Sequence, residues 1–143
     1  ECTLTLIGLG ELEERLKRKY SQENITFKGR CSREETLQLI SSSKYLIHSS
    51  LMYETFGLTI LEAMSLATPV IGFNIGTRID LIKNDENGFL CCPRDLEKII
   101  IKSHHYNDYE RLSKNALKAA EKFQNDKVTL EQIEIYKTIL EDK

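Results

Sequence analysis

Short apolar runs alternate with longer amphipathic stretches between residues 3 and 91. The runs hold three to five residues each and lie at 3–7, 24–27, 45–48, 69–73 and 89–91. Strands that alternate with helical stretches of about 10 to 15 residues are typical of βαβ units and a parallel sheet. Because the runs are almost continuously apolar, we expect helices to cover both faces of that sheet. The pattern therefore predicts an α/β fold, with a Rossmann-like parallel sheet and helices on both of its faces.

Local signals delimit the helices between these strands. Charged positions predict a helix over 11–20. Ser32 with Glu35 three residues later forms a capping-box pattern, which predicts that a helix begins just after Ser32. A helix over 57–66 must end before Pro69, because proline disfavours helix in the residue before it and cannot continue one.

The tail from about residue 95 to residue 143 is predicted to be helical throughout. Its last helix, 124–143, carries an apolar face formed by Ile133, Tyr136, Ile139 and Leu140. We expect this face to dock on this domain, on another domain or on a neighbouring molecule, so self-association is one of the predicted partnerships.

The composition is that of a folded domain, and it mainly excludes some classes of partner. With 41% hydrophobic residues and only two prolines, the chain has enough apolar side chains for a core. The net charge of -2 excludes bulk attraction to nucleic acid or to an anionic membrane, and no apolar run approaches the roughly 20 residues that span a bilayer. The spacing of the four cysteines does not match a metal site and favours reduced thiols in a cytoplasmic protein.

The stretch ETFGLTILE at 54–62 carries the candidate chemistry, because it places glutamates at both ends of a mostly apolar run. Glu54 would lie in the loop that enters the 57–66 helix, and Glu62 between one and two turns inside it. A helix N-terminus offers unpaired N–H groups and a partial positive charge, which together bind anions. Gly57 would let a ligand approach the backbone closely.

These positions predict the chemical class of a ligand. A phosphate on the N–H groups of Gly57, Leu58 and Thr59 would repel the two glutamates, which instead suit hydroxyl donors on either side. A nucleoside diphosphate sugar has this arrangement, with Glu62 accepting from the ribose and Glu54 from the sugar. For either glutamate alone, a helix cap or an exposed helix side chain is the commoner explanation, so the neighbouring motifs decide.

Residues 46–93 closely resemble the C-terminal, donor-binding domain of GT-B type retaining glycosyltransferases, the glycosyltransferases group 1 family. The family signature has two glutamates separated by seven residues, with Phe-Gly between them and Glu-Ala-Met at the end. The matching residues are Glu54, Phe56-Gly57-Leu58, Glu62-Ala63-Met64, Pro69-Val70-Ile71, Gly76 and Asn87-Gly88-Phe89-Leu90. The resemblance runs from about Leu4 to Tyr136, nearly the whole chain.

The resemblance implies a role for each matched position. Glu54 is the implied catalytic residue, in contact with the donor sugar near the reacting carbon. Gly8 and Gly10 would line the phosphate side, and the backbone around Arg30 would contact the base. The implied nucleotide-sugar-binding residues are Gly8, Gly10, Arg30, Phe56, Gly57, Leu58, Thr59 and Glu62.

The implied reaction moves a sugar from a UDP- or GDP-linked donor to a glycan or lipid-linked acceptor with retained configuration. It needs no metal and no further cofactor, because helix dipole and basic residues neutralise the leaving diphosphate. We expect a cytoplasmic protein, peripheral to the inner face of the plasma membrane, that builds cell-surface or storage glycans.

The resemblance also implies a gap. The first βα unit of the donor domain and the acceptor-binding N-terminal domain are not present, so residues 1–143 are expected to be one nucleotide-sugar-binding domain from a longer, two-domain enzyme. In the usual strand order 3-2-1-4-5-6 the missing strand is central, which would leave a slot in the sheet. We expect the fragment alone to be inactive.

Two alternatives stay open, a nucleotide-sugar-binding module without transfer activity and a GT-B-like epimerase. A nicotinamide-dependent enzyme fits poorly, because Glu13 stands where the third glycine of the fingerprint would be. Ala67 departs from the family, which usually has glycine there. A left-handed alanine at that helix end would cost about 1 kcal/mol.

Overall fold

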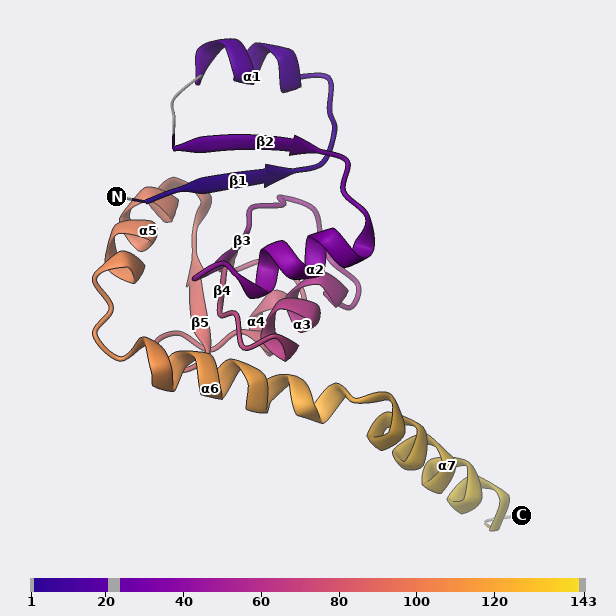
Figure 1. Cartoon of the computed structure of the whole chain (residues 1–143). Coiled ribbons are helices and arrows are strands. Elements are labelled where there is room, and N and C mark those ends of the chain that lie inside the picture. Colours follow the sequence, from indigo (N-terminus) through magenta and orange to yellow (C-terminus); the bar gives the residue numbers. More distant parts are fainter. Residues whose placement is uncertain (1, 21–23, 142–143) are drawn as a thin grey trace. The chain divides into compact units, whose positions relative to one another are not determined.

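The computed structural model describes residues 2–20 and 24–141, and these form two compact units, 1–39 and 40–143 (Figure 1). Each unit is described separately below. The α/β fold class predicted from the sequence is confirmed, because each unit holds parallel strands joined through helices. The single domain expected over 1–143 stays a prediction.

The first unit is a strand–helix–strand motif. Strand β1 (Leu4–Ile7) pairs in parallel with β2 (Ile25–Gly29), and α1 (Glu13–Lys19) lies in the crossover between them. Parallel neighbours need such a crossover, because the chain must return to the end where the first strand began. The helix begins two residues later than predicted, after a turn at 11–12.

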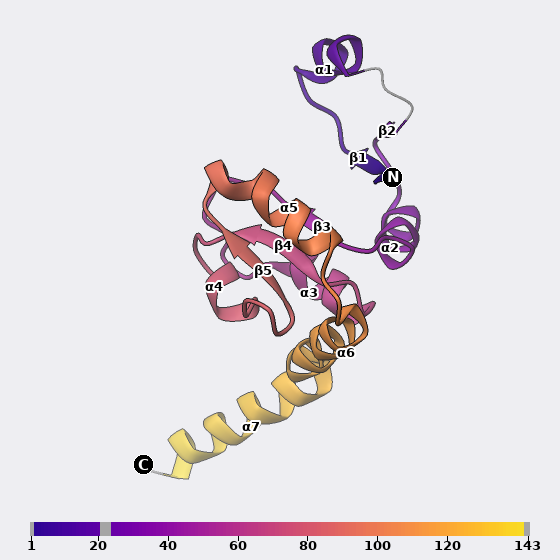
Figure 2. The same cartoon turned by 90° about the vertical axis from the view of Figure 1, so that its left-hand side faces the viewer.

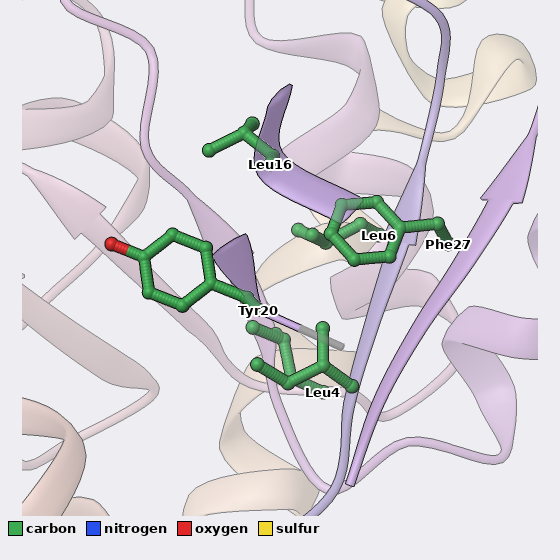
Figure 3. Close-up of a pocket in the computed structure, with 6 residues that line it drawn as sticks. Leu4, Leu6, Leu16, Tyr20 and Phe27 are labelled. Atoms are coloured by element: carbon green, nitrogen blue, oxygen red, sulfur yellow. The ribbon is translucent and has the colours of Figure 1, made fainter. Parts of the chain in front are cut away.

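An open apolar pocket of about 250 Å³ lies between α1 and the two strands of this unit. Figure 3 shows five of its six lining residues labelled; the full set is Leu4, Leu6, Leu16, Tyr20, Ile25 and Phe27. The alternate residues of both strands therefore turn toward the helix, as the period of two in a strand requires.

Helix α2 (Arg33–Ser41) begins with the predicted capping box. The Ser32 Oγ accepts a hydrogen bond from the Glu35 N–H at 3.1 Å, and Glu35 Oε2 accepts one from the Ser32 N–H at 2.8 Å. The two contacts satisfy one backbone donor each. The hydrogen bonds from Ser32 also lower the pKa of the Glu35 carboxyl, since they stabilise its charged form.

The second unit is built on three parallel strands in the order β3-β4-β5. They are β3 (Leu46–His48), β4 (Val70–Phe73) and β5 (Gly88–Cys91). Helix α3 (Leu58–Ser65) connects the first two, and the four-residue α4 (Arg78–Leu81), which the sequence did not predict, follows β4.

The tail is helical, as predicted, except for short breaks between its helices. After the short 3-10 turn η1 (Pro93–Asp95) come α5 (Leu96–His104), α6 (Tyr109–Ala120), the 3-10 turn η2 (Glu121–Phe123) and α7 (Asn125–Glu141). The first break falls at Asn107-Asp108, residue types whose side chains favour turns over helix.

Helices cover both faces of the three-stranded sheet, as predicted. On one face, Val70 packs with Ile60 and Met64 of α3 and with Ala116 of α6. On the other face, Ile71 and Phe89 pack against α5, which lies over β4 and β5 in Figure 2. Consecutive residues of β4 thus enter opposite layers of the core.

Helix α3 ends in a left-handed turn at Ala67, whose φ is 58°. The Thr68 N–H then reaches back to the carbonyl of Ala63 at 2.9 Å, which completes the helix end. The Ser113 hydroxyl donates to the Ala67 carbonyl at 2.6 Å and so ties this turn to α6. Such contacts offset the cost of about 1 kcal/mol of a left-handed alanine.

Within the described residues, the strands form two separate sheets, β1-β2 and β3-β4-β5. In the six-strand order expected from the resemblance, this division falls where the missing central strand would pair. That such a strand exists elsewhere in the protein stays a prediction.

Candidate functional site

The candidate site lies at the carboxyl edge of the three-stranded sheet. Because β3 and β4 are parallel, their carboxyl ends lie side by side, and ligands of α/β folds bind at this edge. The loop 49–57 leads from β3 into α3, and the loop 74–77 leads from β4 into α4.

The N-terminus of α3 is open for an anion. The N–H groups of Ile60 and Leu61 both donate to the carbonyl of Gly57, at 3.0 and 3.1 Å. Among the described residues, no hydrogen bond is donated by the N–H groups of Leu58 or Thr59, and both side chains are exposed. These two donors and the start of the helix dipole are available to an anion, and the binding of a phosphate here stays a prediction.

Gly57 is required at this helix start for two reasons. Its backbone is left-handed, with φ 82° and ψ 42°, which a residue with a Cβ rarely adopts. A Cβ would also lie 2.9 Å from Cδ1 of Leu81. The glycine therefore lets α3 begin directly against α4, a reason that differs from the ligand approach predicted from the sequence.

Glu54 is held by its backbone and by its side chain. Its carbonyl accepts a hydrogen bond from the Thr77 hydroxyl at 3.2 Å. The left-handed Gly76 packs against the same residue, since a Cβ there would lie 3.5 Å from both N and O of Glu54. The carboxylate Oε1 lies 3.3 Å from Nε2 of His48, and the side chain is 34% exposed. Glu54 is thus fixed at the edge and still accessible to a ligand.

A fully buried arginine, Arg78, organises this edge and was missed from the sequence. Its Nε donates to the carbonyl of Ile75 at 2.9 Å, and its Nη1 to that of Ser50 at 2.8 Å. Its Nη2 donates to the carbonyl of Met52 at 2.6 Å. Nη1 also lies 3.0 Å from Nδ1 of His48. One side chain therefore joins the loops that follow β3 and β4.

No sequence signal singles out Arg78. In the structure it occupies the first position of α4, where the dipole is unfavourable for a cation. None of the ion pairs among the described residues involves Arg78. Its charge is compensated by carbonyl oxygens instead, and hydrogen bonds of this kind are what make a buried charge tolerable.

His48 is neutral in this environment. Burial lowers the pKa of its imidazole, the nearby guanidinium of Arg78 lowers it further, and the carboxylate of Glu54 opposes them. Because a guanidinium can only donate, Nδ1 of His48 must accept, and the proton then resides on Nε2. Nε2 lies 3.3 Å from Oε1 of Glu54.

The other predicted site residues are placed as follows. Glu62 is half-buried within α3. The Phe56 ring is half-exposed and makes an edge-on contact with Phe123, the ring centroids being 6.2 Å apart. Gly8, Gly10 and Arg30 belong to the 1–39 unit and are described within it; Gly8 has φ 123° and its N–H donates to the Gly29 carbonyl at 2.7 Å. Their predicted roles stay predictions.

The described residues contain neither a cluster of metal-ligating side chains nor a membrane-spanning helix. No group of three or more His, Cys, Asp or Glu side chains in 2–20 and 24–141 is arranged to hold a metal ion. No helix in that part of the chain has the length and apolar content that a membrane crossing requires.

Known proteins are similar to this chain over most of its length. The model of the glycosyl transferases group 1 family matches residues 1–124. The sulfoquinovosyl transferase SQD2 of Arabidopsis thaliana is 31% identical over 130 residues, which cover 86% of this chain and 25% of that protein. The O-antigen chain mannosyltransferase C of Escherichia coli is 28% identical over 150 residues, covering 98% of this chain and 40% of that protein.

A solved structure is similar over nearly the whole chain. Anabaena Alr3699/HepE in complex with UDP-glucose matches with a TM-score of 0.74 and 26% identity, covering 97% of this chain and 41% of that one. The chain thus spans between 25% and 41% of the length of these three proteins.

Proposed function

The chain belongs to the glycosyl transferases group 1 family, and we propose that the complete natural protein transfers a sugar from a nucleotide-sugar donor to an acceptor hydroxyl. The family and the GT-B class predicted from the sequence are confirmed. The observation that carries the proposal is the start of α3, where two unpaired N–H groups lie beside an accessible carboxylate at the carboxyl edge of the sheet.

In the proposed complex, the donor diphosphate lies on the N–H groups of Leu58 and Thr59. The helix dipole stabilises the negative charge that develops on the leaving diphosphate. Glu54 accepts from a hydroxyl of the sugar, and Glu62 accepts from the ribose. The sugar and the ribose flank the diphosphate in the donor, and the two glutamates flank the N-terminal turn of α3.

The proposed step breaks the bond between the anomeric carbon and the diphosphate oxygen, and that oxygen keeps the electron pair. The acceptor oxygen forms the new bond to the same carbon and loses its proton to a phosphate oxygen of the leaving nucleoside diphosphate. Retained configuration and a glycan or lipid-linked acceptor are proposed from the family resemblance.

The donor is proposed to be UDP- or GDP-linked, with UDP-sugars as the first choice. The support is that the similar Anabaena protein forms a complex with UDP-glucose. Saturation-transfer NMR of the complete natural protein with a panel of UDP-, GDP- and ADP-sugars tests the donor class. Saturation of both ribose and sugar protons by one donor is the expected result, and saturation by none would remove the proposal.

A transfer assay then separates this function from the two alternatives. A binding module would bind the donor without turnover, and an epimerase would change the sugar while leaving it attached to the nucleotide. We expect a free nucleoside diphosphate and a new glycoside in equal amounts.

A further inference from the structure

We propose that His48 is a positioning residue, which uses its Nε2–H to orient the Glu54 carboxylate toward the donor sugar, and that Arg78 holds His48 in the tautomer this needs. The inference rests on the proposed function of Glu54 as the sugar contact. It adds two residues, from β3 and α4, that no sequence motif assigned to the site.

Arg78 is held in one position by its surroundings. Its side chain is fully buried and makes four polar contacts, three of them to backbone carbonyls of the two loops at the sheet edge. Several fixed acceptors around a planar guanidinium leave it a single orientation. The Nη1 atom that faces His48 is therefore set by the fold.

The chemistry of Arg78 sets the position of the proton on the His48 ring. The guanidinium has no acceptor, so His48 Nδ1 must receive the Arg78 Nη1–H, over 3.0 Å. A neutral imidazole has one proton, which is then on Nε2, 3.3 Å from Glu54 Oε1. Both contacts point the same way, from the buried cation through the imidazole to the carboxylate.

The charges around the imidazole keep this arrangement in place. The charged groups that face it are Arg78 from α4 and Glu54 from the loop after β3. A second proton would place an N–H against the guanidinium, with loss of one hydrogen bond and repulsion between two cations. The lowered pKa of His48 agrees with this, and burial is its largest cause.

The contact with His48 restricts the rotamers of the Glu54 side chain. Glu54 is 34% exposed, so without a partner it would sample several rotamers. Because His48 holds Oε1, the other oxygen, Oε2, is presented to the sugar in one orientation. Such preorganisation raises the rate of the chemical step more than it raises donor affinity.

The test is a double-mutant cycle on the complete natural protein. We expect His48→Ala to lower kcat about tenfold with little change in the donor KM, as for the loss of one hydrogen bond to a charged group. In the Glu54→Gln background, the same change should have little effect, because His48 acts through Glu54. An equal loss of kcat in both backgrounds would overturn the inference.

Rescue and a matched control complete the cycle. His48→Gln keeps an N–H donor near the position of Nε2, so it should recover most of the activity, and failure to recover it while the variant remains folded would contradict the inference. His105→Ala, an exposed histidine after α5, is expected to leave kcat unchanged. If the wild type transfers no sugar, the proposed function fails; if it transfers and His48→Ala keeps its kcat, only the inference fails.

The tautomer has a readout independent of catalysis. Nitrogen-15 spectra of the histidine side chains distinguish a protonated Nε2 from a protonated Nδ1, and His48→Gln identifies the signal that belongs to His48. We expect the Nε2–H form at neutral pH. An Nδ1–H form, or a doubly protonated ring, would overturn the proposed direction of the hydrogen bonds.

Discussion

Gly57 and Leu81 approach so closely that no methyl group fits between them, because a Cβ on Gly57 would lie 2.9 Å from Cδ1 of Leu81. The contact joins Gly57, which immediately precedes α3, to the last residue of α4. The position of the first turn of α3 therefore depends on it. The same glycine has a left-handed backbone, with φ 82°.

Gly57→Ala is therefore expected to destabilise the protein. The left-handed alanine costs about 1–2 kcal/mol, and the end of the Leu81 side chain must shift to make room for the new Cβ. Differential scanning calorimetry of the complete natural protein should show a lower Tm for this variant. Gly10→Ala is the matched control, because a Cβ there meets no atom within 4 Å and its φ is not positive. Equal Tm values for both variants would contradict the role of this contact.

Replacement of Arg78 by methionine should destabilise the protein, because each buried acceptor that loses its donor costs about 1–3 kcal/mol. The change leaves three backbone carbonyls and His48 Nδ1 without their donor. Equilibrium urea unfolding measures the loss. Arg94→Met is the matched control, since the Arg94 side chain is 87% exposed and its ion pair with Asp95 spans 3.8 Å. A loss below about 1 kcal/mol for Arg78→Met would contradict the role of Arg78 as the link between the two loops.

The features that sequence reasoning found are local ones. The capping box needs only Ser32 and Glu35, three residues apart, and both hydrogen bonds form. The end of α3 before Pro69 follows from the proline itself. Continuous apolar runs carry a strong signal in an α/β protein, and the strands were predicted within one residue at each end, except that β2 runs two residues further, to Gly29.

The features that sequence reasoning missed depend on contacts between distant residues. His48 and Arg78 are 30 positions apart, and their contact arises only when β3 and β4 align. The break in the tail depends partly on Tyr106, whose hydroxyl donates to the carbonyl of Asp85, 21 positions earlier. Such partners have no fixed spacing, so a single sequence gives no pattern for them. The sequence thus predicted the start of α3 and not the side chains of His48 and Arg78 that lie near it.

The lowered pKa of His48 gives the protein a specific pH dependence. The unfolded histidine binds a proton near its ordinary pKa of about 6.5, while the folded one binds it only at lower pH. The stabilisation is therefore complete above about pH 6.5 and is lost as the pH falls toward the lowered folded-state pKa, by up to about 1.4 kcal/mol per pH unit.

Urea unfolding at pH 7.5, 6.5 and 5.5 tests this dependence. His48→Gln should lose less stability than the wild type between pH 6.5 and pH 5.5, because it has no titrating group at this position. His105→Gln should keep the wild-type profile. Parallel profiles for the wild type and His48→Gln would show that His48 binds its proton equally in both states.

The two glutamates are expected to differ in what their removal changes. Glu62→Ala should weaken binding of every donor in the UDP-, GDP- and ADP-sugar panel by about tenfold, because all of them share the ribose and one hydrogen bond to a carboxylate is lost. Glu54→Ala should mainly reduce turnover and the discrimination between sugars, since its carboxylate lies at the sugar end of the proposed site. Isothermal titration gives the donor Kd, and initial rates give kcat. The control for the loss of one negative charge is Glu97→Ala, because Glu97 is an exposed glutamate in the first turn of α5. Equal donor affinity in the wild type and in Glu62→Ala would remove Glu62 from the donor site, and an unchanged kcat with unchanged discrimination between sugars for Glu54→Ala would remove Glu54 from it.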